Sequence, residues 1–271
     1  MRDSERAALA RLNDLGGDQL VRELVGLYLD QTSERLAAAR NALGQHDGAL
    51  LAASAHAIRS SSAQLGAQDL VWTCESLEAS AESRDLVRAA HALREVSDAF
   101  DAFGAWLTEV GVGDHVSVNE PNRVADPGPP SDRPVTIAVV EDNADNRLLI
   151  DAILGETYQL DEYATGTEAL EMMSAHPPAL VLLDVSLPGM DGLDVLARMR
   201  RDAVLRDVPV VADTAHAMAG DRDRYLAAGF DGYVPKPIVD ERVLIDAIER
   251  LLPEQPEGSK RDRRNSRDSL E

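Results

Sequence analysis

The sequence has almost no cysteine: Cys74 is the single example among 271 residues. One cysteine excludes an internal disulfide framework. Cys74 falls on a helical apolar pattern with Leu70 and Leu77, which predicts a core position.

Basic residues are also scarce, since 27 Lys and Arg stand against 48 Asp and Glu, for a formal net charge of −21. This imbalance argues against binding nucleic acid through a broad basic surface.

Long hydrophobic runs are missing as well. No apolar stretch approaches the roughly 20 residues that span a bilayer, and the first ten residues hold no apolar segment typical of a signal peptide. We therefore expect no membrane insertion and a cytoplasmic location. Aromatic residues make up only 4% of the chain, but aliphatic residues are plentiful, which suits helical and α/β cores. The length allows about two domains.

The chain divides into four regions, which predicts a multidomain protein. Residues 1–111 carry long patterns of helical period and almost no strand signal, so they predict an all-α, four-helix-type bundle. Residues 112–134 are rich in Pro, Gly, Asp and Asn and predict a flexible linker. Residues 135–253 alternate five short apolar runs with helical patterns, which predicts an α/β doubly wound domain of five parallel strands. Residues 254–271 predict a disordered polar tail.

Within the helical region, one stretch carries a histidine in an unusual setting, "AHAIRSSSAQLGA", residues 55–67. The apolar stripe of this helix lies roughly 140° from His56, because a helix turns ~100° per residue. His56 is therefore predicted to point to solvent, with small neighbours such as Ser60 around it and Arg59 close to it at i+3. An exposed imidazole nitrogen beside a cation suits a phosphoryl acceptor. No orienting carboxylate lies nearby in the sequence, so an acyl-transfer triad is not indicated.

The stretch from His56 to Ala67 resembles the signature of histidine phosphotransfer (HPt) domains, and the resemblance extends over roughly residues 5–110. "LARLNDLGGDQLVRELVGLYLDQTSERL" is similar to the first two helices of that family, and "LVWTCESLE" to the helix after the active one. The resemblance implies that His56 is phosphorylated, with Arg59, Ser60 and Gln64 as its site neighbours. Two residues depart from the pattern: Arg59 replaces the usual Lys, and Ser60 replaces a Gly and adds a side chain where the partner domain approaches.

A second group of chemical residues follows the predicted strands of the C-terminal region. Sites in open α/β sheets lie at the carboxyl ends of the strands. These ends carry Glu141 with Asp142, then Asp184, Thr214 and Lys236. Carboxylates that converge at one edge repel one another and need a cation, for which oxygen ligands favour Mg²⁺. One carboxylate can then act as a nucleophile and form an acyl phosphate.

Residues 135–252 resemble the receiver domains of two-component response regulators, a flavodoxin-like family, through "VVEDNADNR", "LVLLDVSLPGMDG", "VVADTAHAM" and "GFDGYVPKPI". The resemblance implies that Asp184 accepts a phosphoryl group. It implies that Glu141, Asp142, Asp184 and the backbone carbonyl of Ser186 hold Mg²⁺. The phosphoryl-binding and switch residues that it implies are Thr214, Ala215, Tyr233 and Lys236, and it implies a cis bond between Lys236 and Pro237.

Asp213 departs from this resemblance, because it stands where the family has an apolar residue. Side chains alternate along a strand, so Asp213 is expected to face away from the site if Thr214 faces it. We hypothesise that Asp213 tunes the region after the fourth strand that moves on phosphorylation.

The two resemblances together imply a two-component phosphorelay protein that carries phosphoryl groups on His56 and Asp184. The chain is too short for an ATP-binding kinase domain and lacks a Gly-rich phosphate loop, so we expect a phosphocarrier rather than an enzyme. Only the phosphorylation and dephosphorylation of the receiver itself would be catalysed. The expected phosphodonor is a sensor histidine kinase or the receiver of a hybrid kinase, and the expected acceptor is a downstream receiver or HPt protein.

Two alternatives stay open at this point. In the first, only the receiver is chemically active, and the helical bundle is a docking module with an idle His56. In the second, the chain is a fragment of a larger hybrid kinase or response regulator.

Overall fold

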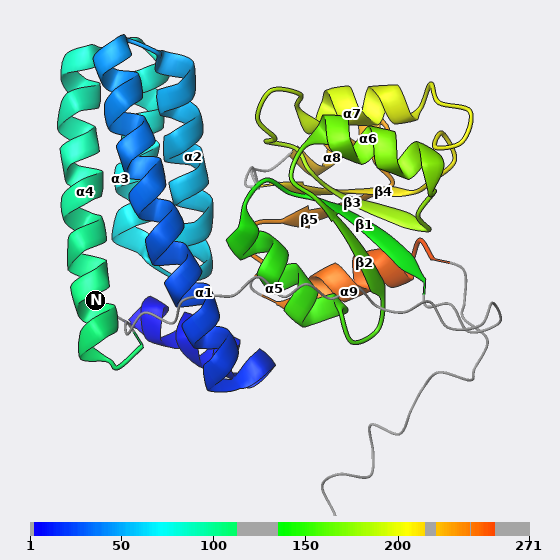
Figure 1. Ribbon diagram of the computed structural model, residues 1–271, viewed down its shortest axis with the longest axis horizontal. Coiled ribbons are helices and arrows are strands. Elements are labelled where there is room, and N and C mark those ends of the chain that lie inside the picture. The colour runs from blue at the N-terminus through cyan, green and yellow to red at the C-terminus, as the bar shows by residue number, and fades with distance from the viewer. Residues whose placement is uncertain (1–2, 113–134, 215–220, 239, 253–271) are drawn as a thin grey trace, which may run out of the picture.

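The computed structural model describes residues 3–112, 135–214, 221–238 and 240–252. Most of the predicted linker and all of the predicted tail lie outside these residues. The N-terminal part is a bundle of helices, and the C-terminal part is a sheet covered by helices on both faces (Figure 1). The multidomain fold predicted from the sequence is confirmed. Among the described residues, no helix is both long enough and apolar enough to cross a membrane.

The bundle contains α1 (Asp3–Gln45), α2 (Gly48–Gln64), α3 (Gln68–Glu82) and α4 (Leu86–Glu109). The first helix is bent at Gly16 and Gly17, because both residues have non-helical backbone angles. Gly17 has φ +69°, in the left-handed region that favours glycine. The bend allows the N-terminal arm of α1 to fold back at one end of the bundle (Figure 1).

The predicted apolar stripe of α2 is the buried face of that helix. Leu51, Ala55 and Ile58 have at most 1% of their surface exposed. Tyr28 of α1 fixes the register of the bundle core, since its hydroxyl lies 3.0 Å from the Ser62 hydroxyl of α2. Its ring packs edge-on against Phe103 of α4, with 5.8 Å between ring centroids.

The receiver-like part is a five-stranded parallel sheet in the order β2-β1-β3-β4-β5. The strands are β1 (Thr136–Val140), β2 (Gln159–Tyr163), β3 (Leu180–Asp184), β4 (Val210–Thr214) and β5 (Gly232–Pro235). The helices are α5 (Ala144–Leu154), α6 (Gly166–Ala175), α7 (Gly192–Met199), α8 (Asp221–Ala228) and α9 (Glu241–Glu249). Helices α5 and α9 cover one face of the sheet, and α6, α7 and α8 cover the other (Figure 1). This arrangement brings the ends of β1, β3, β4 and β5 to one edge.

The two parts of the chain are packed against each other. Helix α1 of the bundle contacts α5 of the receiver-like part. One continuous cluster of buried apolar side chains runs from the bundle core to the face of the sheet that α5 and α9 cover. Figure 1 shows α1 and α2 on the side of the bundle that faces this sheet. The domains therefore share an apolar contact as well as a peptide connection.

The start of α7 depends on a glycine that no other residue can replace without a shift of backbone. A Cβ atom on Gly192 would lie 2.5 Å from the carbonyl oxygen of Asp184 and 2.7 Å from the Cα of Val185. We expect Gly192→Ala to lower the free energy of unfolding by about 1–3 kcal/mol, as overpacking does. Chemical denaturation of the full chain measures this change.

Gly44 is the matched control, because a Cβ at this helical position meets no atom within 4 Å. We expect Gly44→Ala to raise the free energy of unfolding by about 0.5–1 kcal/mol, since alanine loses less backbone entropy in a helix. Equal effects of the two substitutions would contradict the packing seen at Gly192.

Candidate functional site

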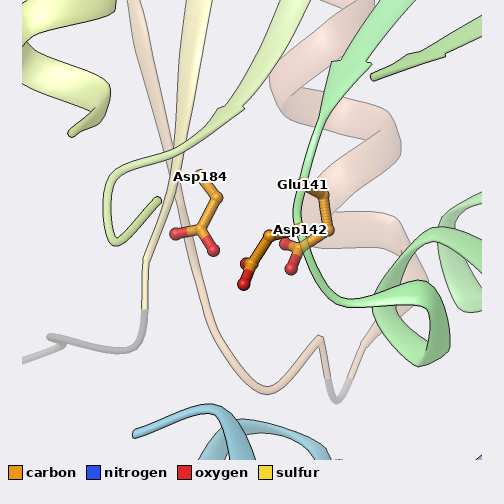
Figure 2. A group of neighbouring side chains, drawn as sticks. All are labelled: Glu141, Asp142 and Asp184. Atoms are coloured by element: carbon orange, nitrogen blue, oxygen red, sulfur yellow. The ribbon is translucent and has the colours of Figure 1, made fainter. Parts of the chain in front are cut away.

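Three carboxylates meet at the carboxyl edge of the sheet. Glu141 and Asp142 follow β1, and Asp184 ends β3 (Figure 2). Each offers one oxygen, and these oxygens lie within 4.8 Å of one another. Burial and the neighbouring charge of Asp184 raise the pKa of Asp142. A set of close oxygen ligands with net negative charge fits Mg²⁺.

Lys236 lies at the centre of this acidic group. Its Nζ donates to Oε2 of Glu141 at 2.5 Å and to Oδ2 of Asp184 at 2.8 Å. Burial acts to lower the pKa of Lys236, but Asp184, Glu141 and Asp213 outweigh it and hold the pKa well above its usual value. Burial raises the pKa of Glu141 to about 8, although Lys236 opposes this shift. The lysine is therefore a permanent cation in a pocket of carboxylates. Its bond to Pro237 is cis, as predicted.

Asp213 lies beside Lys236, so the prediction that it faces away from the site is wrong. Its Oδ2 lies 3.8 Å from Nζ of Lys236. The two faces of β4 do alternate, but Asp213 shares its face with Val211, and Thr214 shares the opposite face with Ala212. The lysine reaches the face of Asp213. Burial raises the pKa of Asp213 to about 7, with Lys236 opposing the shift.

Asp213 is expected to make stability depend on pH when no Mg²⁺ is present. A carboxyl group with a raised pKa binds more protons in the folded state, so stability falls as pH rises between 3.8, its ordinary value, and about 7. Because asparagine carries no charge to be desolvated at this buried position, Asp213→Asn is expected to raise the free energy of unfolding by about 1–3 kcal/mol above this range.

Denaturation titrations at several pH values measure this effect. Asp207→Asn is the matched control, because the Asp207 side chain is 94% exposed, and it is expected to change little. A wild-type pH profile that Asp213→Asn leaves unaltered would remove Asp213 as the cause.

Two of the predicted switch residues, Thr214 and Tyr233, share a neighbour on α8, whereas Lys236 belongs to the acidic group. The hydroxyl of Thr214 lies 3.4 Å from that of Tyr225 on α8. Tyr225 stacks on Tyr233 with 6.0 Å between ring centroids. Tyr225 thus joins two predicted residues, and the sequence analysis missed it because only the packing of α8 brings it there. Ala215 lies outside the described residues.

Two asparagines that the sequence analysis also missed connect the acidic group to α5. The backbone N–H of Asn143 and the side chain of Asn146 donate to Oε1 of Glu141 at 3.1 and 2.9 Å. Asn143 also caps α5, since its side chain accepts from the N–H of Asp145. The backbone N–H of Ser186, a predicted metal-site residue, donates to Oδ1 of Asp184 at 2.8 Å.

His56 lies among charged side chains of the bundle. Its Nδ1 is 3.2 Å from Nη2 of Arg59 and 3.6 Å from Oε1 of Glu78 on α3. Arg59 Nε donates to the same Glu78 oxygen at 2.8 Å. The imidazole is only 23% exposed. The prediction that His56 points fully into solvent is therefore wrong, because its side chain is partly buried. Glu78 supplies the carboxylate that the sequence near His56 lacks.

The remaining predicted neighbours of His56 face the receiver-like part. Ser60 and Gln64 are buried, with 8% and 5% of their surface exposed. Asn146 donates to the Ser60 hydroxyl at 3.4 Å, and the Gln64 side chain donates to Asn146. The expectation of an exposed Ser60 is therefore wrong, because the C-terminal part of the chain covers it.

Comparison with known families finds two matches on this chain. The family described as "Hpt domain" matches residues 23–106, and the "Response regulator receiver domain" matches residues 137–249. The polar-differentiation response regulator DivK of Brucella anthropi is 40% identical over 120 residues, which cover 44% of this chain and 97% of that protein. DivK of Brucella ovis is 39% identical over 118 residues, which cover 43% of this chain and 95% of that protein.

Solved structures also resemble the C-terminal part. The receiver domain of a sensor histidine kinase from Pseudomonas aeruginosa, solved with a magnesium ion in its active-site cleft, is 32% identical, with a TM-score of 0.40. The match covers 43% of this chain and 95% of that one. The N-terminal domain of a response regulator receiver protein from Methanoculleus marisnigri is also 32% identical, with a TM-score of 0.36 and coverage of 44% and 98%.

Proposed function

We propose that Asp184 and His56 are the two phosphoryl carriers of this chain. The chain belongs to the response regulator receiver family and is a two-component phosphorelay protein, and its Hpt domain precedes its receiver domain. The observation that carries this proposal is the acidic group at the sheet edge, where Asp184 lies against Lys236 and two further carboxylates. No other group of residues described in the receiver domain combines a nucleophilic oxygen, a buried cation and metal ligands.

Asp184 is the proposed nucleophile of the receiver. One of its carboxylate oxygens attacks the phosphorus of the donor, and the donor atom leaves with its electron pair. Lys236, whose Nζ lies 2.8 Å from Oδ2, stabilises the negative charge that spreads over the phosphoryl oxygens. We propose that Glu141, Asp142, Asp184 and the carbonyl of Ser186 hold Mg²⁺, which neutralises part of the same charge when bound.

The proposed switch couples the phosphoryl group to the face of the domain near α8. Thr214 lies within hydrogen-bond distance of Tyr225, which stacks on Tyr233. A phosphoryl group on Asp184 competes for the Thr214 hydroxyl. The loss of its contact with Tyr225 would then free the stacked tyrosine pair to rearrange.

His56 is the proposed carrier of the Hpt domain. Because Nδ1 lies 3.2 Å from Arg59 and 3.6 Å from Glu78, we propose that the phosphoryl group is carried on Nε2. Arg59 balances the incoming negative charge, and Glu78 stabilises the positive charge that the ring gains on attack.

The partners follow from this chemistry. We propose a sensor histidine kinase or a hybrid-kinase receiver as the phosphodonor and a downstream receiver or Hpt protein as the acceptor. The chain itself acts as a phosphocarrier, and its catalysis extends only to the phosphorylation and dephosphorylation of its own receiver.

Site-resolved mass spectrometry tests this proposal. The purified chain is incubated with a small-molecule phosphodonor and Mg²⁺, beside Asp184→Asn and His56→Ala. We expect a phosphoryl group on Asp184 in the wild type and in His56→Ala, and no labelling of the receiver in Asp184→Asn. Labelling of another receiver residue in the wild type would contradict the assignment of Asp184. The assignment of His56 would be contradicted if His56 received no phosphoryl group from a labelled receiver, either within one chain or between two chains.

A further inference from the structure

We infer that the Hpt domain of this chain is the docking partner of the receiver in the same chain, and that it takes the phosphoryl group from Asp184 onto His56 within one molecule. This inference rests on the proposed function, whose two carriers it joins. Beyond that function, we infer which domain docks on the receiver, which residues form the interface, and that the phosphoryl group passes from Asp184 to His56.

The interface contains a set of polar contacts that pair the two domains residue by residue. The Asn143 side chain of the receiver donates to the Ser61 hydroxyl of α2 at 2.6 Å. Asn146 accepts from the Gln64 side chain and donates to Ser60. All five residues are buried. Buried amides and hydroxyls are costly unless they are hydrogen-bonded, so each domain supplies partners that the other needs.

Ser60 has a function in this arrangement. It is the residue that replaces a glycine of the family pattern at the point where a partner domain approaches. Its hydroxyl accepts from Asn146, so the added side chain meets the receiver with a matching donor. The departure from the family pattern is therefore complementary to the receiver of this chain.

Charge complementarity supports the same pairing. Arg35 of α1 donates through Nη1 to the Ser61 hydroxyl at 3.0 Å. The same hydroxyl accepts from Asn143 of the receiver, so this cation of the bundle lies at the interface. Asp145 of α5 is buried, with 3% of its surface exposed, and the charge of Arg35 opposes the rise that burial causes in its pKa. A cation of the bundle thus lies near a buried acid of the receiver, which favours this orientation.

A cavity of about 190 Å³ lies between the domains. Arg59 and Ser60 of the bundle line it on one side, and Lys236 and Pro237 of the receiver line it on the other. Arg59 contacts the ring of His56, and Lys236 contacts the carboxylate of Asp184. The cavity therefore lies between a side chain that contacts His56 and one that contacts Asp184, and its volume exceeds that of several water molecules.

The transfer step balances within these residues. The lone pair on Nε2 of neutral His56 attacks the phosphorus of the Asp184 acyl phosphate, and an N–P bond forms. The P–O bond to Asp184 breaks, and its electron pair returns to the carboxylate. The ring keeps the proton on Nδ1 and becomes positively charged next to Glu78, while Lys236 again pairs with the free carboxylate of Asp184.

Transfer within one molecule has a kinetic signature. We expect the rate of His56 labelling, after rapid loading of Asp184 by the small-molecule donor, to stay constant over a roughly hundredfold range of chain concentration, because the linked domains have a fixed effective concentration. A mixture of His56→Ala and Asp184→Asn chains can transfer only between molecules. Its rate is expected to be lower and to rise in proportion to concentration.

Arg35→Glu tests the interface itself. The substitution removes the donor to Ser61 and places a negative charge near the buried carboxylate of Asp145, and we expect the concentration-independent rate to fall by at least about tenfold. Labelling of Asp184 is expected to persist. Arg40→Glu is the matched control on the same helix, because Arg40 is exposed and bonds to Ser97 of α4 within the bundle. It is expected to leave the rate unchanged.

The docked arrangement is also tested without phosphorylation. The single native cysteine, Cys74, is buried, and the side chains of Ser61 and Asn143 meet across the interface at 2.6 Å, so the double variant Ser61→Cys/Asn143→Cys is expected to form a disulfide cross-link under mild oxidation. A cross-link within the monomer supports the inference. Cross-linked dimers alone, or no cross-link, would overturn it.

The kinetic outcomes separate the inference from the proposed function. Labelling of His56 that rises with concentration and equals the rate of the mixed chains would overturn the intramolecular relay and leave both carriers assigned. If neither residue were labelled, the proposed function would be wrong. The cross-linking experiment would still test whether the two domains dock within one chain.

Discussion

Replacing Lys236 with methionine is expected to lower the rate of phosphorylation at Asp184 by about 10²- to 10³-fold, the usual loss when one preorganised charge-stabilising group is removed. Lys236 is the cation that lies within hydrogen-bond distance of both Asp184 and Glu141. Methionine keeps an unbranched side chain that ends one atom short of Nζ, and it removes the charge and the hydrogen-bond donors. Single-turnover labelling with a small-molecule phosphodonor at saturating Mg²⁺ measures the rate.

The same variant is expected to be less stable when Mg²⁺ is absent. Loss of one partner from a buried ionic group costs about 3–5 kcal/mol of unfolding free energy, and Lys236→Met leaves Glu141, Asp184 and Asp213 without a cation. Mg²⁺ is expected to restore part of the loss, since it replaces the missing positive charge. Arg206→Met, at an exposed position, is the control for both measurements. A variant that matches this control in rate would remove Lys236 from the reaction.

Replacing Glu78 with glutamine is expected to lower the rate of His56 phosphorylation by about 10²-fold. The Glu78 carboxylate holds Arg59 at 2.8 Å and faces Nδ1 of His56 at 3.6 Å. Glutamine keeps the shape of the side chain but loses the charge that stabilises the phosphorylated ring. We therefore expect Glu78→Gln to slow labelling of His56 while Asp184 accepts its phosphoryl group at the normal rate.

The pH profile of transfer separates positioning by Glu78 from a general loss of structure. A carboxylate beside an imidazole favours its protonated form, so removal of the charge is expected to shift the pH dependence of His56 labelling to lower pH. Glu75→Gln, at an exposed position of the same helix, is the matched control. If both variants transfer at the same rate, Glu78 acts only in packing.

These predictions place the chemistry on two sides of one interface. Lys236 and Arg59 line the same cavity between the domains, and each contacts a different proposed carrier. The interface also limits access for outside proteins, because a docked bundle covers Asn143 and Asn146. Under the proposed function, a kinase or a second receiver would have to displace the bundle, and the rate of opening would then limit the exchange of phosphoryl groups with partners.

The sequence by itself determined the fold class and most of the receiver site. Parallel strands end at one edge of a sheet, so reading the residues after each apolar run was enough to bring Asp184, Glu141 and Lys236 together. The helical period likewise predicted the buried face of α2 and the placement of Arg59 beside His56. Both predictions depend on local geometry that repeats along a single element.

Only the tertiary structure decided which residues from other elements complete the two sites. Glu78 reaches His56 because of the register between α2 and α3, and Tyr225 reaches Thr214 because of how α8 packs on the sheet. Asp213 was assigned to the wrong side, since alternation along a strand gives opposite faces but does not say which face a distant lysine reaches. The burial of Ser60 depends on the docking of two domains. Such contacts join residues far apart in sequence, and side-chain packing, rather than any periodic pattern, determines them.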